Sequence, residues 1–292
     1  MRTTLAVSAI VACAGAGLAA PALADASPRR DVASLRVAGL TIDGRLVTFR
    51  ADRPGSVTDA GRIDGLKGDK KVVGIDYRVQ DGKLYAVGDQ GGVYTLSGRA
   101  QAAKVSQLSV ALDGKNFGVD FNPAANRLRV VSDTGQNLRH NIDDPMGAPA
   151  AGTTATDGRL TNPPVPPATT GATALGVSGA AYTNNDLDAT TATTLFDVDT
   201  TADQVSAQSP ANAGNLAPTG RLGVDAGPSA GFDIYTTLRK GVAVANAGYA
   251  ALRAGDSYRF YAVDPLTGAA TQVGTFPSRR QVMDVALPLD QR

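Results

Sequence analysis

The first residues of this chain that could do chemistry are aspartates at matching places in a repeated apolar motif. They are Asp76, Asp120, Asp233 and Asp284, with Ser178 at the corresponding place in a further copy. A ring of carboxylate oxygens could bind calcium, which prefers oxygen ligands, or supply a general base. Without partners, such anions would repel one another and resist ionisation. We favour the structural alternative, in which each carboxylate accepts hydrogen bonds from backbone amides, because regular recurrence is typical of residues that build a fold.

A second polar set is confined to one repeat. A hairpin with a three-residue turn at 133–135 would place Arg129 opposite Arg139. Side chains on one face of this hairpin could then bind a carboxylate, a sulfate or a sugar through forked hydrogen bonds. This candidate ligand-binding set is Arg127, Arg129, Asn137, Arg139 and Asn141. Pairing with Asp side chains of a neighbouring blade is the alternative that we favour. His140 aligns with Leu96 of the preceding repeat, so we expect it to be a packed side chain rather than a base.

The composition excludes several kinds of site. The chain has one His, one Cys and, among its 27 acidic residues, no Glu. These numbers exclude a two-histidine zinc site and a Glu general acid, and a Ser-His-Asp triad could use only His140. A net charge of +1 gives no electrostatic attraction for nucleic acid or an anionic membrane. No catalytic motif is assembled, so the sequence leaves open whether the protein is an enzyme.

The N-terminal segment has the features of a secretory signal peptide. A basic start and an apolar run over residues 5–20 precede an Ala-x-Ala pattern, so we expect cleavage after Ala24, which removes residues 1–24. The alternative is a lipobox that leaves Cys13 acylated. No later segment is long and apolar enough to span a membrane. The sequence therefore predicts a secreted protein, and we expect it to be a monomer.

An internal repeat organises the rest of the chain. Gly74-Ile75-Asp76-Tyr77 recurs as Gly118-Val119-Asp120-Phe121, and a third copy begins at Gly231. The strong copies continue as short alternating segments separated by turn residues, which is typical of β-strands. Repeats of about 40–50 residues that each form about four short strands are the signature of a β-propeller. The sequence therefore predicts an all-β fold.

The two ends of the chain indicate how the propeller closes. Val282 to Leu289 reads as an inner strand with nothing after it. Three segments near the N-terminus read as the outer strands of a blade that lacks its inner strand: 35–41, 45–50 and 56–63. Pairing of these ends would complete a fifth blade. We therefore predict five blades, or six if the irregular fourth unit conceals another, in one domain over residues 34–292 after a flexible leader at 25–33.

The segment from Gly118 to Asn141 resembles a known family. The motifs that carry the resemblance are Asp120-Phe121-Asn122-Pro123, Arg127-Leu128-Arg129-Val130-Val131 and Gly135-Gln136-Asn137-Leu138-Arg139. They resemble the uncharacterised secreted bacterial family known as domain of unknown function 4394, over about residues 34–290. The resemblance implies an exported, propeller-like domain and no known reaction, ligand or catalytic residue. The copy with Ser178 departs from the pattern, which argues against a strictly symmetric site.

These observations favour a non-catalytic secreted propeller that binds an extracellular small molecule, glycan or protein at one mouth of the ring. One alternative is a calcium-supported hydrolase or lyase that acts in the channel, with Asp120 or Asp233 as the base. Another is a structural protein of the cell envelope or matrix. Calcium is the one cofactor that the residues suggest, and nucleic acid is not an expected partner.

Overall fold

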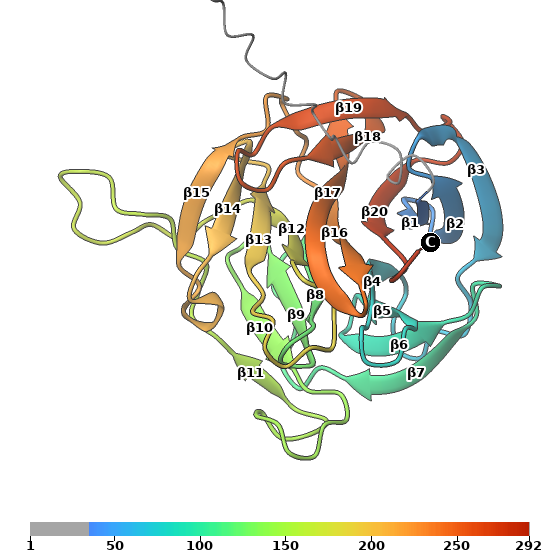
Figure 1. Cartoon of the computed structure of the whole chain (residues 1–292), viewed down its shortest axis with the longest axis horizontal. Helices are drawn as coiled ribbons and strands as arrows, with labels where there is room; N and C mark the ends of the chain where they lie inside the picture. The colour runs from blue at the N-terminus through green and yellow to red at the C-terminus, as the bar shows by residue number, and fades with distance from the viewer. Residues whose placement is uncertain (1–34, 292) are drawn as a thin grey trace, which may run out of the picture.

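Five four-stranded antiparallel sheets surround a central axis in the computed structural model, which describes residues 35–291 (Figure 1). Blade 1 consists of β20 (Val282–Ala286), β1 (Arg36–Thr41), β2 (Arg45–Arg50) and β3 (Arg53–Arg62). Blade 2 consists of β4 (Val72–Tyr77), β5 (Leu84–Gly88), β6 (Gly92–Leu96) and β7 (Ala102–Gln107). Blade 3 consists of β8 (Phe117–Asn122), β9 (Arg127–Ser132), β10 (Asn137–His140) and β11 (Thr154–Thr156).

The last two blades follow the same plan. Blade 4 consists of β12 (Val177–Tyr182), β13 (Leu195–Asp199), β14 (Gln204–Gln208) and β15 (Leu216–Arg221). Blade 5 consists of β16 (Ala230–Arg239), β17 (Val242–Ala254), β18 (Ser257–Val263) and β19 (Ala270–Thr275). Within the described residues the one helix is a single 3-10 turn, Ala211–Ala213, so none of them forms a helix that could cross a bilayer.

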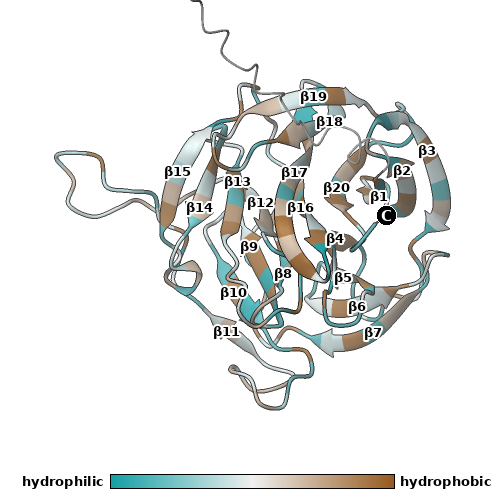
Figure 2. Cartoon of the chain, viewed as in Figure 1, coloured by the Kyte–Doolittle hydropathy of each residue, from teal (hydrophilic) through white to brown (hydrophobic). Residues whose placement is uncertain are grey.

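Burial explains which segments became inner and outer strands. Inner strands such as β12 are buried along their whole length because neighbouring blades cover both of their faces. The outer strand β7 instead alternates half-buried and exposed residues, since only one of its faces is covered. Figure 2 shows this difference as apolar stretches in strands near the axis, such as β4 and β20.

The apolar core is divided into five clusters, and each lies between two neighbouring blades. The cluster between blades 1 and 5 is rich in aromatic rings. There Phe49 packs edge-on against Phe260 and Phe276, with ring centroids 5.1 and 5.2 Å apart. Edge-to-face pairs of this kind add stability beyond the area that they bury. Aromatic packing therefore stabilises the seam of the ring.

The predicted closure is confirmed. Strand β20 pairs antiparallel with β1, with Ala286 opposite Ala38 and Asp284 opposite Leu40. Beyond the strand, the Gln291 side chain accepts a hydrogen bond from the backbone N–H of Arg36 and donates one to its carbonyl. The described residues form five sheets, so the irregular fourth unit does not conceal a sixth blade. The predicted leader at 25–33 and the signal peptide lie outside the described residues.

Glycines on the inner strands allow neighbouring strands to approach closely. A Cβ atom at Gly231 would lie 2.3 Å from the Asp284 Cα and 2.8 Å from the Met283 carbonyl oxygen, which are backbone atoms that cannot rotate away. We expect Gly231→Ala to lower the free energy of unfolding by about 3 kcal/mol, the upper end of the usual cost of overpacking. Urea denaturation would measure this loss.

A matched glycine replacement serves as the control. A Cβ atom at Gly98, in the β6–β7 turn, would have no neighbouring atom within 4 Å. Gly98→Ala should therefore change the free energy of unfolding by no more than about 0.5 kcal/mol. Equal stability of the Gly231→Ala and Gly98→Ala variants would contradict the close packing of β16 against β20.

Candidate functional site

Three inner-strand carboxylates each accept a hydrogen bond from the next blade. Asp76 Oδ2 accepts one from the Phe121 N–H at 2.8 Å, and Asp120 Oδ1 accepts one from the Tyr182 N–H at 3.1 Å. In blade 5, Asp233 Oδ2 accepts one from the Leu287 N–H at 2.5 Å. Every one of these bonds links an inner strand to the segment that follows it round the ring. The three aspartates therefore accept the backbone hydrogen bonds that the structural alternative predicted.

Two further side chains complete the circle of inter-blade bonds. Asp284 Oδ2 accepts a hydrogen bond from the Ile75 N–H at 2.8 Å, and Ser178 Oγ accepts one from the Ala230 N–H at 3.1 Å. Each of the five blades is thus tied to the next by one polar side chain of its inner strand.

The alignment of Ser178 and Asp284 with the other aspartates was wrong. In blade 3, Asp120 of β8 lies opposite Arg129 of β9. In blade 4, the residue opposite the corresponding position of β13, Phe196, is Ala181. Ala181 and not Ser178 therefore occupies the aspartate position of this copy. The sequence offered two glycines in this copy, Gly176 and Gly179. The strand register shows that Gly179 corresponds to Gly74, because each follows a bulge, after Val177 in β12 and after Val72 in β4. At the other end of the chain, Leu287 donates to Asp233 as Phe121 donates to Asp76, so Ala286 occupies the aspartate position. Asp284 lies two residues earlier, about 7 Å along the strand.

This register explains which carboxylates converge. Oxygen atoms of Asp76, Asp120 and Asp233 lie within 4.8 Å of one another, and all three residues are buried. Burial and the neighbouring carboxylates raise the pKa of Asp76 and Asp120 well above the usual range, and burial raises the pKa of Asp233 to about 6. Calcium binds oxygen ligands at about 2.3–2.6 Å, so one ion could contact all three side chains. Asp284 is not part of this group, although burial raises its pKa too.

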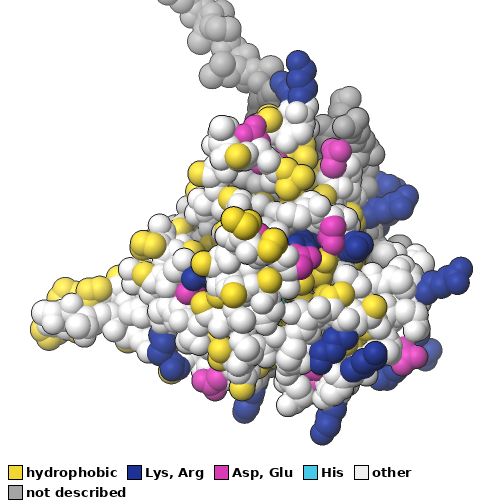
Figure 3. Space-filling view, turned by 90° about the horizontal axis from the view of Figure 1, so that it is seen from below, with side chains coloured by type: hydrophobic (Ala, Val, Ile, Leu, Met, Phe, Trp, Pro, Cys, Tyr) yellow, Lys and Arg dark blue, Asp and Glu magenta, His cyan; other side chains and the backbone are white. Residues whose placement is uncertain are grey.

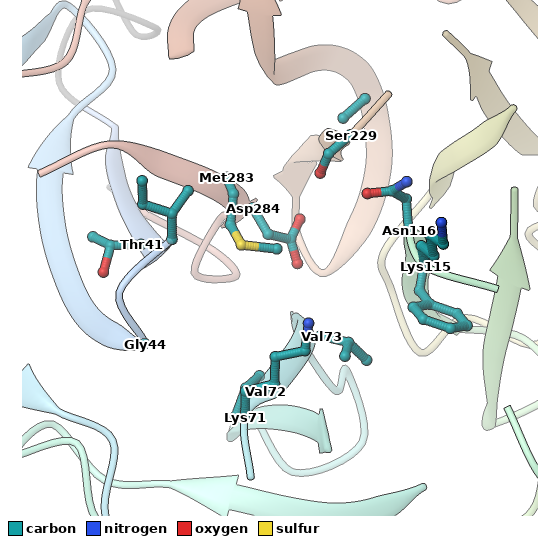
Figure 4. Close-up of a pocket in the computed structure, with 13 residues that line it drawn as sticks. Thr41, Gly44, Lys71, Val72, Val73, Lys115, Asn116, Ser229, Met283 and Asp284 are labelled. Carbon is teal, nitrogen blue, oxygen red and sulfur yellow. The ribbon is translucent and has the colours of Figure 1, made fainter. Parts of the chain in front are cut away.

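A pocket opens at the end of the channel where the inner strands begin (Figure 4). Its volume is about 90 Å³. The walls are apolar and come from β4, β8, β16 and β20, and include Val72, Val73, Phe117, Ala230 and Met283. Polar side chains of Lys71, Lys115, Asn116, Ser229 and Asp284 also line it. Figure 4 shows the Asp284 carboxylate at the centre, with the Ser229 hydroxyl and the Asn116 amide across from it. A cavity of this kind can hold a small polar ligand and fix its orientation.

The predicted hairpin register in blade 3 is confirmed. Arg129 lies opposite Arg139, Leu128 lies opposite His140, and Gly135 has the left-handed conformation, with φ of 82°. The two arginines share one partner, because both donate to Asp157 Oδ2, at 2.7 and 3.1 Å. The predicted face of the hairpin therefore exists.

The polar side chains on this face bind partners within the protein. Arg129 is 1% exposed and donates further hydrogen bonds to Asn137, to Tyr182 and to Asn212. Elsewhere on the face, Arg127 donates to Asp144 and to backbone carbonyls, and Asn141 bonds Asp144 and Pro149. The carboxylate partners, Asp144 and Asp157, come from segments that follow β10 in the same repeat. The expectation that they would belong to a neighbouring blade was therefore wrong. A role of these five residues in ligand binding stays a prediction.

His140 is packed, as its alignment with Leu96 predicted. The ring is fully buried, with Nε2 2.8 Å from Ser106 Oγ and Nδ1 3.0 Å from Thr154 Oγ1. Burial lowers its pKa from 6.5 to about 4, so the ring is neutral at neutral pH.

Protonation of His140 is expected to destabilise the protein in acid. The unfolded chain binds this proton near pH 6.5, whereas the native state binds it only near pH 4. The stability that the neutral ring supplies is therefore present above pH 6.5 and is lost as the pH falls from 6.5 to 4. The loss amounts to at most about 3 kcal/mol. His140→Gln should remove this part of the pH dependence. Urea denaturation of both proteins between pH 4 and 7 would measure the difference, and parallel profiles would contradict the prediction.

Sequence reasoning missed the residues of the channel mouth apart from Asp284. Lys71 and Lys115 each stand three residues before the motif glycines Gly74 and Gly118, so their recurrence was a signal that the alignment already contained. Ser229 had no such signal, because it joins them only through the closure of the ring. Figure 3 shows the ring from its edge, with most of the visible Lys and Arg side chains in the lower half of the view.

Comparisons with known proteins show the family. A model of the family described as Domain of unknown function (DUF4394) matches residues 45–286. No curated protein matches the chain. Among solved structures, an auxiliary nutrient binding protein from Bacteroides thetaiotaomicron is 11% identical, with a TM-score of 0.42 over 88% of this chain and 62% of that one.

Two other solved structures show the same degree of similarity. A protein of unknown function from Bacteroides thetaiotaomicron is 14% identical, with a TM-score of 0.40 over 88% of this chain and 64% of that one. An auxiliary nutrient binding protein from Bacteroides ovatus is 12% identical, with a TM-score of 0.39 over 78% of this chain and 56% of that one. The chain spans less than two thirds of the length of each of the three structures.

Proposed function

The chain belongs to the DUF4394 family, and on that premise we propose that it is a secreted, non-catalytic β-propeller that binds a small extracellular ligand at the mouth of its channel. The observation that carries this proposal is the pocket in Figure 4, to which four of the five blades contribute. Apolar walls with a few convergent polar groups are the usual composition of a ligand site. A rigid ring that presents loops at its mouth is suited to recognition.

Blocking the pocket tests this proposal. Ser229 is half-buried at the pocket wall, so Ser229→Trp should fill the cavity without reaching the core. On an array of extracellular oligosaccharides, the natural protein is expected to retain a defined set that Ser229→Trp binds at least tenfold more weakly. Thr237→Trp, at an exposed position near the far end of β16, is the control and should bind normally. Binding that survives Ser229→Trp would overturn the proposal.

Export is a separate part of the proposal and has its own test. The basic start, the apolar run and the Ala-x-Ala pattern support removal of the first 24 residues. N-terminal sequencing of the protein from culture fluid should therefore begin at Asp25. A diacylglycerol adduct on Cys13 would favour the lipoprotein alternative.

Binding of a structural calcium ion on the axis is a second function that we propose, because three buried carboxylates converge there. Three buried carboxylates, Asp76, Asp120 and Asp233, bring oxygen atoms within 4.8 Å of one another. Calcium held there would neutralise their mutual repulsion and stabilise the ring. The hydrolase or lyase alternative would also need substrate to reach Asp120, which is 2% exposed, so the geometry favours a structural ion over catalysis.

Calorimetry tests the calcium role. Titration of the chelator-treated protein with calcium chloride should show one binding event that Asp120→Asn abolishes. The exposed Asp225→Asn is the matched control and should bind as the natural protein does. No heat of binding, together with an unchanged melting temperature in calcium, would overturn this role.

A further inference from the structure

We infer that the ligand of the channel mouth is a carboxylated oligosaccharide, an inference that rests on the proposed function and specifies its ligand. The first observation is that the pocket does not end at the axis. A second hollow of about 280 Å³ lies beside it, and both are lined by Ile42, Gly44, Lys71 and Val72. Together the two hollows reach the lower end of the range of about 300–1,000 Å³ that is usual for ligand sites. The site is therefore an extended groove that runs from the axis toward the junction of blades 1 and 2.

Four basic side chains follow this groove. Lys115 lines the axial pocket, Lys71 lines both hollows, and Lys70 and Arg62 line the second hollow. All four are exposed. Within residues 35–291, none of the four side chains takes part in an ion pair or a side-chain hydrogen bond. Elsewhere in that part of the chain, Arg45, Arg78, Arg127, Arg129, Arg139 and Arg280 do pair with Asp.

The acidic side chains that line the groove, Asp43 and Asp284, offset only part of this charge, because they face four basic side chains. Asp284 accepts hydrogen bonds from the Ile75 and Val285 N–H groups, and Asp43 accepts one from the Thr41 hydroxyl at 2.6 Å. Both carboxylates are therefore engaged in the fold, whereas the ammonium and guanidinium groups are free to meet a ligand. With four basic side chains against two carboxylates, the groove keeps an excess of positive charge, which attracts an anionic ligand.

The other lining groups indicate which kind of anion. Amide and hydroxyl groups of Asn116 and Ser229 can bind sugar hydroxyls, and apolar side chains such as Val72 and Met283 can pack against the C–H faces of a pyranose ring. Phe117 is the one aromatic ring that lines the two hollows, so stacked nucleobases find no platform. Basic groups distributed along a groove match carboxylates that recur along a chain of sugars.

Binding of three probes tests the inference. Isothermal titration calorimetry at low ionic strength would compare an oligogalacturonate, a neutral dextran oligomer and a dextran sulfate oligomer of similar length. We expect the oligogalacturonate to bind at least tenfold more tightly than the neutral oligomer. The double variant Lys71→Gln, Lys115→Gln should lose at least tenfold of this affinity.

A matched double variant separates the groove from net charge. Arg239→Gln, Lys240→Gln removes the same number of charges from the far end of β16, nine residues and about 30 Å beyond Ala230, and should bind as the natural protein does. An equal loss in both double variants would overturn the inference, as would tighter binding of dextran sulfate than of oligogalacturonate. If the neutral oligomer bound as tightly as the oligogalacturonate, and Ser229→Trp abolished this binding, the inference of an acidic ligand would be overturned and the proposed function would stand. Oligogalacturonate binding that Ser229→Trp does not weaken would overturn both.

Discussion

Replacement of Arg129 by alanine is expected to lower the free energy of unfolding by about 3–5 kcal/mol, the usual cost of removing one member of a buried ion pair. The side chain is 1% exposed and donates to Asp157, Asn137 and Asn212. Asn212 lies beyond β14, so the guanidinium joins blade 3 to blade 4. Its removal leaves a buried carboxylate with fewer donors, and this is the source of the large cost. Equilibrium urea denaturation at pH 7 would measure it.

Arg139 provides the matched control. It also donates to Asp157, but 23% of its side chain is exposed. Because water can replace its contacts, Arg139→Ala should cost no more than about 1 kcal/mol. A loss in Arg129→Ala no greater than that in Arg139→Ala would show that the buried network does not stabilise the boundary between these blades.

Raising the pH from 4 to 8 in the presence of a chelator is expected to destabilise the protein through its axial carboxylates. Burial raises the pKa of Asp76 and Asp120 well above the value of 3.8 for the unfolded chain, and raises that of Asp233 to about 6. The native state therefore holds protons that the unfolded chain releases. The stability that these protons supply is complete below about pH 4 and is lost as the pH rises through the native pKa values. Asp233 alone accounts for about 3 kcal/mol.

Asp120→Asn tests the assignment of this effect. The amide oxygen can still accept the hydrogen bond from the Tyr182 N–H, while one charge leaves the cluster. A pKa shift of one unit corresponds to about 1.4 kcal/mol. We therefore expect the free energy of unfolding of the variant at pH 8 to exceed that of the natural protein by at least about 1 kcal/mol. Urea denaturation between pH 4 and 8 would measure both proteins, with the exposed Asp225→Asn as the control. A natural protein whose stability rises with pH over this range, at a slope that Asp120→Asn leaves unchanged, would contradict the prediction.

The parts of the fold that could be predicted are those that repetition or a short turn determines. Gly74 and Gly118 begin matching copies, so the spacing of the blades follows from the sequence. Gly135 supplies the left-handed residue of its turn, and the pairing of Arg129 with Arg139 follows from that local geometry. The closing strand was predictable because the first blade lacked an inner strand.

The parts that escaped prediction depend on a choice between similar local patterns or on distant segments. The alignment of Ser178 failed because this copy has two glycines, Gly176 and Gly179, and only the strand register shows that Gly179 is the equivalent of Gly74. Asp144 and Asp157, which pair with the blade 3 arginines, lie in the irregular segments that follow β10 and β11 of that repeat. The mouth pocket joins segments as distant as Lys71 and Ser229, so it exists only once the ring has closed.

The pairing of β20 with β1 also determines when the first sheet can be completed during synthesis. Among the residues of the ring, 282–286 leave the ribosome last, yet they finish the sheet that the earliest strands begin. Until then β1 remains an open sheet edge, and open edges recruit strands from other chains. We therefore expect a copy that ends before residue 282 to aggregate rather than to bind its ligand more weakly.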